Sequence, residues 1–177
     1  MEKEKTKRIA LIVAFKDFRD EEYFIPKEIF KKEKIQVKTF SDFLGKAIGK
    51  FGGEAKVDDL IDNLNVDDFD GVVFIGGPGA EKYIENERCL EIAREAEKKE
   101  KVLGAICIAP LILSSSGVLE NRKATVWSSQ MDKSAIKELK NSGAIYLEKS
   151  VAIDGKIVTG SMPEVSEPFT REIIKIL

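Results

Sequence analysis

Cys107 is the residue best placed by its neighbours to do chemistry. It follows the apolar run 102–106, which predicts a buried strand, and it precedes Pro110, which suits the first turn of a helix. Small residues stand two places before it and two places after it, at Ala105 and Ala109. A nucleophile elbow needs this spacing because its sharp strand-to-helix turn leaves no room for bulky side chains. We therefore expect a strained, positive φ at Cys107 and a thiol that faces a helix N-terminus, whose free N–H groups favour the thiolate.

The alternative for Cys107 is a buried cysteine at a strand end, since free cysteine is among the most buried residue types. The second cysteine, Cys89, lies in a charged helical stretch and is expected to be structural. Two cysteines make neither a disulfide framework nor a zinc site. The chain contains no histidine, and this limits the bases that can serve a nucleophilic cysteine.

The elements that would position Cys107 alternate between strands and helices. Apolar runs predict strands at 8–15, 35–40, 71–75, 102–106, 124–127, 145–147, 151–153 and 156–158, the last two around a hairpin turn. Residues 17–20 are expected to form a turn, and helices are expected over about 21–32, 87–101, 111–116, 133–141 and 165–177. The Gly-rich stretch 45–57 is expected to form a small hairpin. Its glycine–lysine pairs do not make a phosphate-binding loop, because the glycine spacing is wrong and no Ser or Thr follows the lysine.

This alternation predicts a single α/β domain over residues 1–177, a three-layer α/β/α sandwich with a mostly parallel sheet. Ligands of such folds bind beyond the carboxyl ends of the strands. Three segments meet there on this prediction: the turn before Glu22, the Gly-Gly-Pro-Gly loop at 76–79, and Cys107.

Four motifs follow one another along the chain: Arg-Asp-Glu-Glu at 19–22 with Ile-Pro at 25–26, DGVVFIGGPG at 70–79, the elbow at 105–110, and DGKIVT at 154–159. In this order they resemble the DJ-1/PfpI family, a part of the class I glutamine amidotransferase-like superfamily. The resemblance spans nearly the whole chain. It implies a flavodoxin-like fold with a nucleophile elbow, no metal or organic cofactor, and a homodimer or larger homo-oligomer.

The resemblance also places a glutamate of the first helix beside the elbow cysteine, and counting back from Pro26 makes this Glu22. A carboxyl group next to a thiol can accept or share its proton, and an apolar pocket raises its pKa. Without the resemblance, Glu22 would be an ordinary first-turn glutamate that favours the helix dipole. The backbone N–H groups of Gly76, Gly77 and Ile108 are candidates for holding an oxyanion, although the glycines also fit a tight turn that needs positive φ.

The chain departs from the family where family members carry histidine. Peptidase-like members have a histidine directly after the cysteine, where this chain has Ile108, and others have one on the following strand, near Trp127. A Cys-His dyad is therefore excluded unless a different protein donates the base. This argues against a conventional cysteine peptidase and against a glutamine amidotransferase. We expect Trp127 to line the pocket beside Cys107 and to make it narrower and more apolar.

Composition limits the partners and the compartment. With 43% hydrophobic and 34% charged residues, the chain is typical of a soluble globular domain rather than a disordered one. Its net charge of −2 argues against nucleic acid as a partner. No apolar run reaches the length of a membrane span, and the run at 9–15 lacks the features of a signal peptide. We therefore expect a cytoplasmic protein.

The resemblance implies a glyoxalase III-like or deglycase-like reaction on a small carbonyl compound, in which a 2-oxoaldehyde such as methylglyoxal becomes a hydroxy acid. Cys107 would add to the aldehyde and Glu22 would move protons. One alternative is a non-catalytic stress sensor or chaperone-like protein in which Cys107 is oxidised. Another is a PfpI-type intracellular cysteine peptidase or amidase, which the lack of histidine disfavours. On the leading hypothesis, a protonated Glu22 lies within hydrogen-bond reach of the sulfur, and the thiol reacts below its ordinary pKa of about 8.5.

Overall fold

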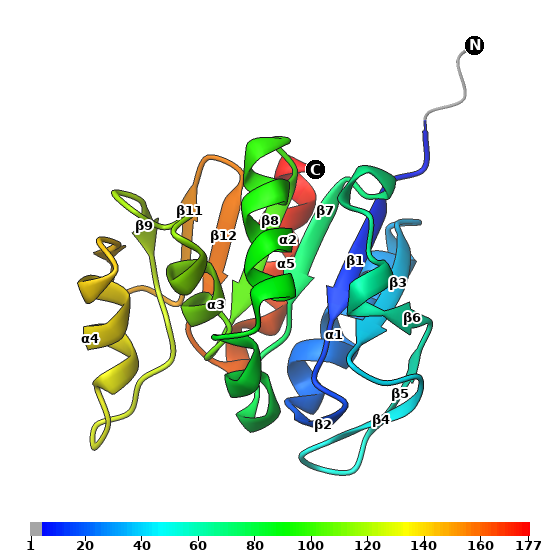
Figure 1. The fold of residues 1–177 in the computed structure, drawn as a ribbon, viewed down its shortest axis with the longest axis horizontal. Coiled ribbons are helices and arrows are strands. Elements are labelled where there is room, and N and C mark those ends of the chain that lie inside the picture. The colour runs from blue at the N-terminus through cyan, green and yellow to red at the C-terminus, as the bar shows by residue number, and fades with distance from the viewer. Residues whose placement is uncertain (1–4) are drawn as a thin grey trace.

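A largely parallel sheet forms the centre of the molecule (Figure 1). The computed structural model describes residues 5–177, and within this range the main sheet has seven strands in the order β11-β12-β8-β7-β1-β3-β6. All neighbouring strands are parallel except β11 and β12, so the predicted sheet type is confirmed. The strands are β1 (Arg8–Ile12), β3 (Gln36–Ser41), β6 (Asp59–Leu60), β7 (Gly71–Phe74), β8 (Val102–Ile106), β11 (Val151–Asp154) and β12 (Ile157–Gly160).

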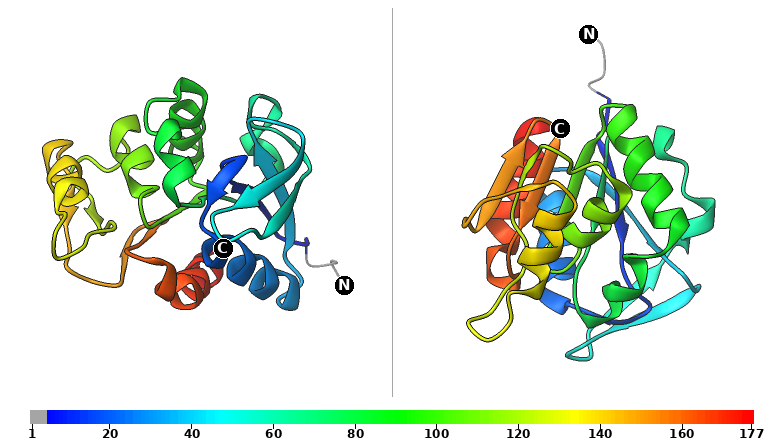
Figure 2. Two further views of the ribbon diagram at one scale, coloured as in Figure 1. Left: turned by 90° about the horizontal axis from the view of Figure 1, so that it is seen from below. Right: turned by 60° about the vertical axis from the view of Figure 1, so that its left-hand side comes forward.

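Helices cover both faces of this sheet, which gives the predicted three layers (Figure 2). One face carries α1 (Asp20–Lys32) and α5 (Ser166–Ile176), which pack against each other. The other face carries α2 (Glu87–Lys98) and α3 (Pro110–Ser116), and α4 (Ser134–Asn141) packs on α3. Short 3-10 segments lie at Ile61–Asn63, Val66–Asp68, Pro78–Tyr83 and Pro163–Val165.

The central strands β7 and β8 are apolar and buried throughout, because both faces of the sheet are covered there. Successive side chains of a strand point to opposite faces. In β1, Ala10 and Ile12 belong to the core on the α2–α3 side, whereas Ile9 and Leu11 belong to the core on the α1–α5 side. None of the four is exposed. This double burial explains why a continuous apolar run, rather than an alternating one, marks the strand in the sequence.

A second, three-stranded sheet lies beside the start of α1. The antiparallel hairpin of β4 (Gly45–Gly49) and β5 (Glu54–Val57) confirms the hairpin predicted in 45–57. β4 also pairs in parallel with β2 (Lys16–Phe18), which leads into α1. The prediction of a simple turn over 17–20 is therefore wrong, because β2 and α1 together occupy most of it.

The strand predicted at 124–127 is also wrong over most of its length. β9 covers only Lys123–Ala124 and pairs with β10 (Ile145–Tyr146) in a separate small sheet. The next backbone N–H groups are engaged elsewhere: Thr125 donates to Oγ1 of Thr159 at 2.9 Å, and Trp127 donates to the carbonyl of Cys107 at 2.8 Å. The hairpin predicted around Asp154 is confirmed by β11 and β12. In the part of the chain that is described, none of the helices combines the length and the apolar character needed to cross a membrane.

Candidate active site

Cys107 occupies the sharp turn between β8 and α3. Its φ of 61° lies in the left-handed region, as the elbow pattern predicts. Its N–H donates to the carbonyl of Gly160 at 2.9 Å, and its carbonyl accepts the N–H of Trp127. Ala105 and Ala109 are fully buried on either side of the turn, where larger side chains would not fit. The surrounding contacts thus hold a backbone conformation that costs about 1–3 kcal/mol.

Glu22 lies in the first turn of α1 and is fully buried. Its Oε2 accepts the N–H of Gly76 at 2.7 Å. A Cβ added to Gly76 would lie 2.5 Å from that oxygen and 2.9 Å from Cβ of Cys107. The carboxyl group and the cysteine therefore pack against the same bare Cα, which is how the loop after β7 brings α1 up to the elbow.

The second carboxyl oxygen of Glu22 has a different environment. Cys107 lies near enough to lower the pKa of this carboxyl group. Within residues 5–177, however, Oε1 has no hydrogen-bond partner. Burial raises the pKa of Glu22 to about 8, and the contacts with Cys107 and Gly76 offset this only in part. The protonated form of the carboxyl is thus the major one at neutral pH. Because Oε2 is engaged as an acceptor, Oε1 is the oxygen available to carry the proton.

The pKa of the Cys107 thiol is raised, so the prediction of an unusually acidic thiol is wrong. Burial is the main cause, and an ionised Glu22 raises the pKa further. The N–H of Ile108 and the guanidinium of Arg19 lower it, but they do not outweigh burial. The helix N-terminus inferred from the sequence is present, yet loss of water around the sulfur has the larger effect.

Gly76 and Gly77 have separate roles in the loop after β7. The N–H of Gly76 holds the Glu22 carboxyl, so it does not serve as the predicted oxyanion donor. Gly77 has a φ of 105°, and a Cβ there would lie 2.4 Å from the backbone nitrogen of Arg19, so only glycine lets the loop dock on the start of α1. Gly77 lines the pocket and the N–H of Ile108 faces the sulfur, which leaves these two as candidate oxyanion donors.

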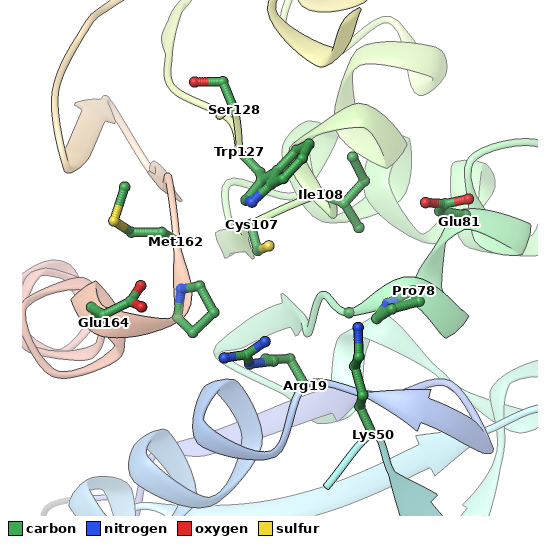
Figure 3. Close-up of a pocket in the computed structure, with 12 residues that line it drawn as sticks. Arg19, Lys50, Pro78, Glu81, Cys107, Ile108, Trp127, Ser128, Met162 and Glu164 are labelled. Atoms are coloured by element: carbon green, nitrogen blue, oxygen red, sulfur yellow. The ribbon is translucent and has the colours of Figure 1, made fainter. Parts of the chain in front are cut away.

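A cavity of about 460 Å³ opens over the sulfur of Cys107 (Figure 3). Trp127 and Ile108 form an apolar wall beside the thiol, so the structure places Trp127 where the sequence analysis expected it. Glu22 lies behind Cys107 and does not line the cavity. The volume suits a small-molecule ligand. The lining residues are Arg19, Lys50, Gly77, Pro78, Glu81, Cys107, Ile108, Trp127, Ser128, Met162, Pro163 and Glu164.

The charged residues of this cavity were not identified from the sequence. Arg19 entered only as part of a motif, and Lys50 only through the rejected phosphate loop. Glu164 follows the carboxyl end of β12, and the rule that ligands bind beyond strand ends points to it. Within residues 5–177 the carboxylate and cysteine side chains form no cluster of three or more that could hold a metal ion.

These features define a class of protein, an α/β sandwich in which an elbow cysteine is paired with a buried carboxyl group. The profile of the DJ-1/PfpI family matches residues 7–176. The chain therefore belongs to the DJ-1/PfpI family.

Relatives with solved structures or curated names match over almost the entire chain. Deglycase PfpI of Pyrococcus furiosus is 34% identical over 94% of this chain and 98% of its own length. Protein/nucleic acid deglycase 2 of Escherichia coli is 30% identical over 97% of this chain and 98% of its own. The crystal structure of a ThiJ/PfpI domain protein from Brachyspira murdochii superposes with a TM-score of 0.92 at 28% identity, covering 98% of this chain and 97% of that one.

Proposed function

We propose that this protein is a cysteine-dependent enzyme that converts small 2-oxoaldehydes and water into 2-hydroxy acids. One observation carries the proposal: the Cys107 thiol lies at the base of a small cavity, with the buried carboxyl of Glu22 packed behind it. The pair has one nucleophile and one proton carrier whose pKa of about 8 is close to the operating pH, as general acid–base catalysis requires.

In the first step, Sγ of Cys107 adds to the aldehyde carbon and the thiol proton passes to the carbonyl oxygen. The product is a hemithioacetal, and the overall charge of the site does not change. The N–H groups of Gly77 and Ile108 would stabilise negative charge that develops on the oxygen.

The second step uses the ionised form of Glu22, which is the minor form at neutral pH because its pKa is about 8. This carboxylate accepts the proton of the former aldehyde carbon and returns a proton to the adjacent ketone carbon. Because Glu22 does not line the cavity, a water molecule relays both protons. The electron pair moves through an enediol, which leaves a thioester on Cys107. Water then cleaves the carbon–sulfur bond, releases the 2-hydroxy acid and restores the thiol. The sequence consumes one water and no external oxidant, because one carbon is oxidised while its neighbour is reduced.

The names of the two deglycase relatives favour a second candidate, removal of carbonyl groups from their adducts with amines or thiols. Cys107 would attack the same carbon and displace the amine or thiol, and the later proton transfers would be the same. Peptide hydrolysis is disfavoured, because the chain has no histidine to protonate a leaving amine.

The test is turnover of methylglyoxal, with lactate measured by NMR. The wild type and Cys89→Ala should form lactate, since Cys89 is buried in α2 away from the cavity. Cys107→Ala and Glu22→Gln should form none. Turnover that survives Cys107→Ala would overturn the proposal. The deglycase candidate is tested on the same four proteins with a preformed adduct of methylglyoxal and N-acetylcysteine.

A further inference from the structure

Two cations, Arg19 and Lys50, form one wall of the cavity. Arg19 lowers the pKa of the Cys107 thiol, but neither cation has been given a contact with the substrate in the steps above. In Figure 3 both rise from the same side of the pocket, and Cys107 and Trp127 lie across from them. We infer that this cationic wall binds an anionic group, so that the preferred substrates are 2-oxoaldehydes that carry a carboxylate or a phosphate. The inference rests on the proposed function and names its substrate class.

The guanidinium of Arg19 is held in one orientation before any ligand arrives. Its Nε and Nη2 donate to the carboxylate of Glu21 at 2.8 and 3.3 Å. Its Cζ lies 4.7 Å from the ring centroid of Phe51. The backbone N–H of Arg19 also donates to the carbonyl of Gly76 at 3.0 Å. In the described part of the chain Nη1 makes no hydrogen bond, so it is available to an anion at little cost in side-chain entropy.

Lys50 reaches the cavity from the turn between β4 and β5, and several hydrogen bonds fix that turn. The carboxylate of Asp20 accepts the N–H groups of Phe51 at 2.9 Å and Gly53 at 2.7 Å. The N–H of Lys50 itself donates to the carbonyl of Phe18 at 2.8 Å. Its ammonium group forms no ion pair with any residue in 5–177. The backbone is thus anchored, while the charge remains free to meet a ligand.

The carboxylates of the cavity stand on other sides of it. Glu81 and Glu164 lie apart from each other and away from the Arg19–Lys50 wall (Figure 3). Neither forms an ion pair within the described residues. They repel an anion from their own sides, so the cationic wall is the favourable place for it. A substrate whose anion rests there would extend its carbonyl end across the cavity toward Cys107.

The kinetic test compares 4,5-dioxopentanoate with its uncharged methyl ester. The acid takes up one water and gives 2-hydroxyglutarate by the steps already described. In the wild type we expect kcat/KM for the acid to exceed that for the ester by about tenfold or more. Arg19→Gln and Lys50→Gln should each reduce this ratio several-fold, mainly through KM. Lys46→Gln is the matched control, because Lys46 lies on the same hairpin, pairs with Glu54 and does not line the cavity.

A binding test separates this inference from the proposed function. Trp127 is the only tryptophan of the chain and lines the cavity, so its fluorescence reports occupancy. In Cys107→Ala, glutarate or inorganic phosphate should change the fluorescence saturably, and addition of Lys50→Gln should weaken binding by about tenfold. Whichever anion binds more tightly identifies the substrate group.

Saturable binding without turnover of any 2-oxoaldehyde would leave the anion site standing and overturn the proposed function alone. Turnover of methylglyoxal with equal kcat/KM for acid and ester, or binding of neither anion, would overturn the cationic wall as a specificity determinant.

Discussion

The backbone N–H of Gly76 donates a 2.7 Å hydrogen bond to Oε2 of Glu22 and fixes that carboxyl behind the elbow cysteine. The bond joins the loop after β7 to the first turn of α1, two segments 54 residues apart. It satisfies one oxygen of a fully buried acid and leaves the other to carry a proton. The acid is therefore a structural contact, and in the proposed function it is also the proton carrier.

Gly76→Ala should abolish turnover of methylglyoxal and destabilise the fold by roughly 1–3 kcal/mol. The new Cβ would lie 2.5 Å from Oε2 of Glu22 and 2.6 Å from the carbonyl oxygen of Ile106, so the carboxyl must move. Urea unfolding and a turnover assay measure the two effects. Gly117→Ala is the control, because a Cβ there meets nothing within 4 Å and the residue caps the end of α3 opposite to Cys107. It should lose stability through its positive φ and keep its activity; a Gly76→Ala protein that behaves in the same way would contradict the role of the 2.7 Å bond.

Glu22→Gln should stabilise the protein at alkaline pH while it removes activity. Burial raises the pKa of Glu22 from 4.5 to about 8. The contribution of the protonated Glu22 carboxyl to the free energy of unfolding is fully present below pH 4.5, where the group is protonated in both the folded and the unfolded chain. This contribution is lost as the pH rises through 8. At about 1.36 kcal/mol for each pKa unit, the loss has an upper bound of roughly 5 kcal/mol, and an amide does not incur it.

Urea unfolding at pH 5, 7 and 9 checks this prediction. The wild type should weaken across the series by more than Glu22→Gln does. Glu28→Gln, on the exposed side of α1, should keep the wild-type profile. A wild-type free energy of unfolding that is flat from pH 5 to 9 would mean that the buried carboxyl is already ionised.

Alkylation of Cys107 by iodoacetamide should accelerate as the pH rises through about 8. At that pH Glu22 loses its proton and becomes able to accept the proton of the thiol, so the pair reacts with one shared negative charge. In Glu22→Gln the step near pH 8 should vanish, and alkylation should begin only where the buried thiol itself ionises, above the ordinary range.

Mass spectrometry of the alkylated site gives the measurement. Cys89 should remain unmodified in the native protein, because burial raises its pKa to about 12. Superimposable pH profiles for the wild type and Glu22→Gln would show that the Glu22 carboxyl does not accept the proton of the Cys107 thiol.

The elements that carry local signals could be predicted from the sequence. The apolar run before Cys107 marks a strand buried on both faces, and the small residues at 105 and 109 mark the elbow with its positive φ. The hairpin around Asp154 follows from its turn residues. In each case the signal lies within a few residues of the feature that it predicts.

The rest depends on contacts between distant segments. β9 ends early because the N–H of Thr125 finds the side chain of Thr159, which nothing near 125 announces. The pKa of the thiol depends on how much of the sulfur is sealed from water, which only the assembled cavity determines. Arg19 and Lys50 line the same cavity because the β4–β5 hairpin folds back on the start of α1.

Ile108→His should make Cys107 reactive at lower pH. Ile108 follows the cysteine directly, lines the cavity and has its N–H toward the sulfur. An imidazole there, with an ordinary pKa of about 6.5, becomes positively charged when it takes the thiol proton. Each charge then favours the other, which raises the pKa of the histidine and lowers that of the thiol. We expect alkylation of Cys107 at pH 7 to increase by about tenfold or more over the wild type.

Ile108→Gln should show no such gain, because an amide fills similar space without taking a proton. Trp127→His, on the neighbouring cavity wall, should show the gain if its ring also reaches the sulfur. Equal rates for Ile108→His and Ile108→Gln across pH 5–9 would mean that the imidazole points away from the thiol and that this elbow does not accept a Cys-His dyad.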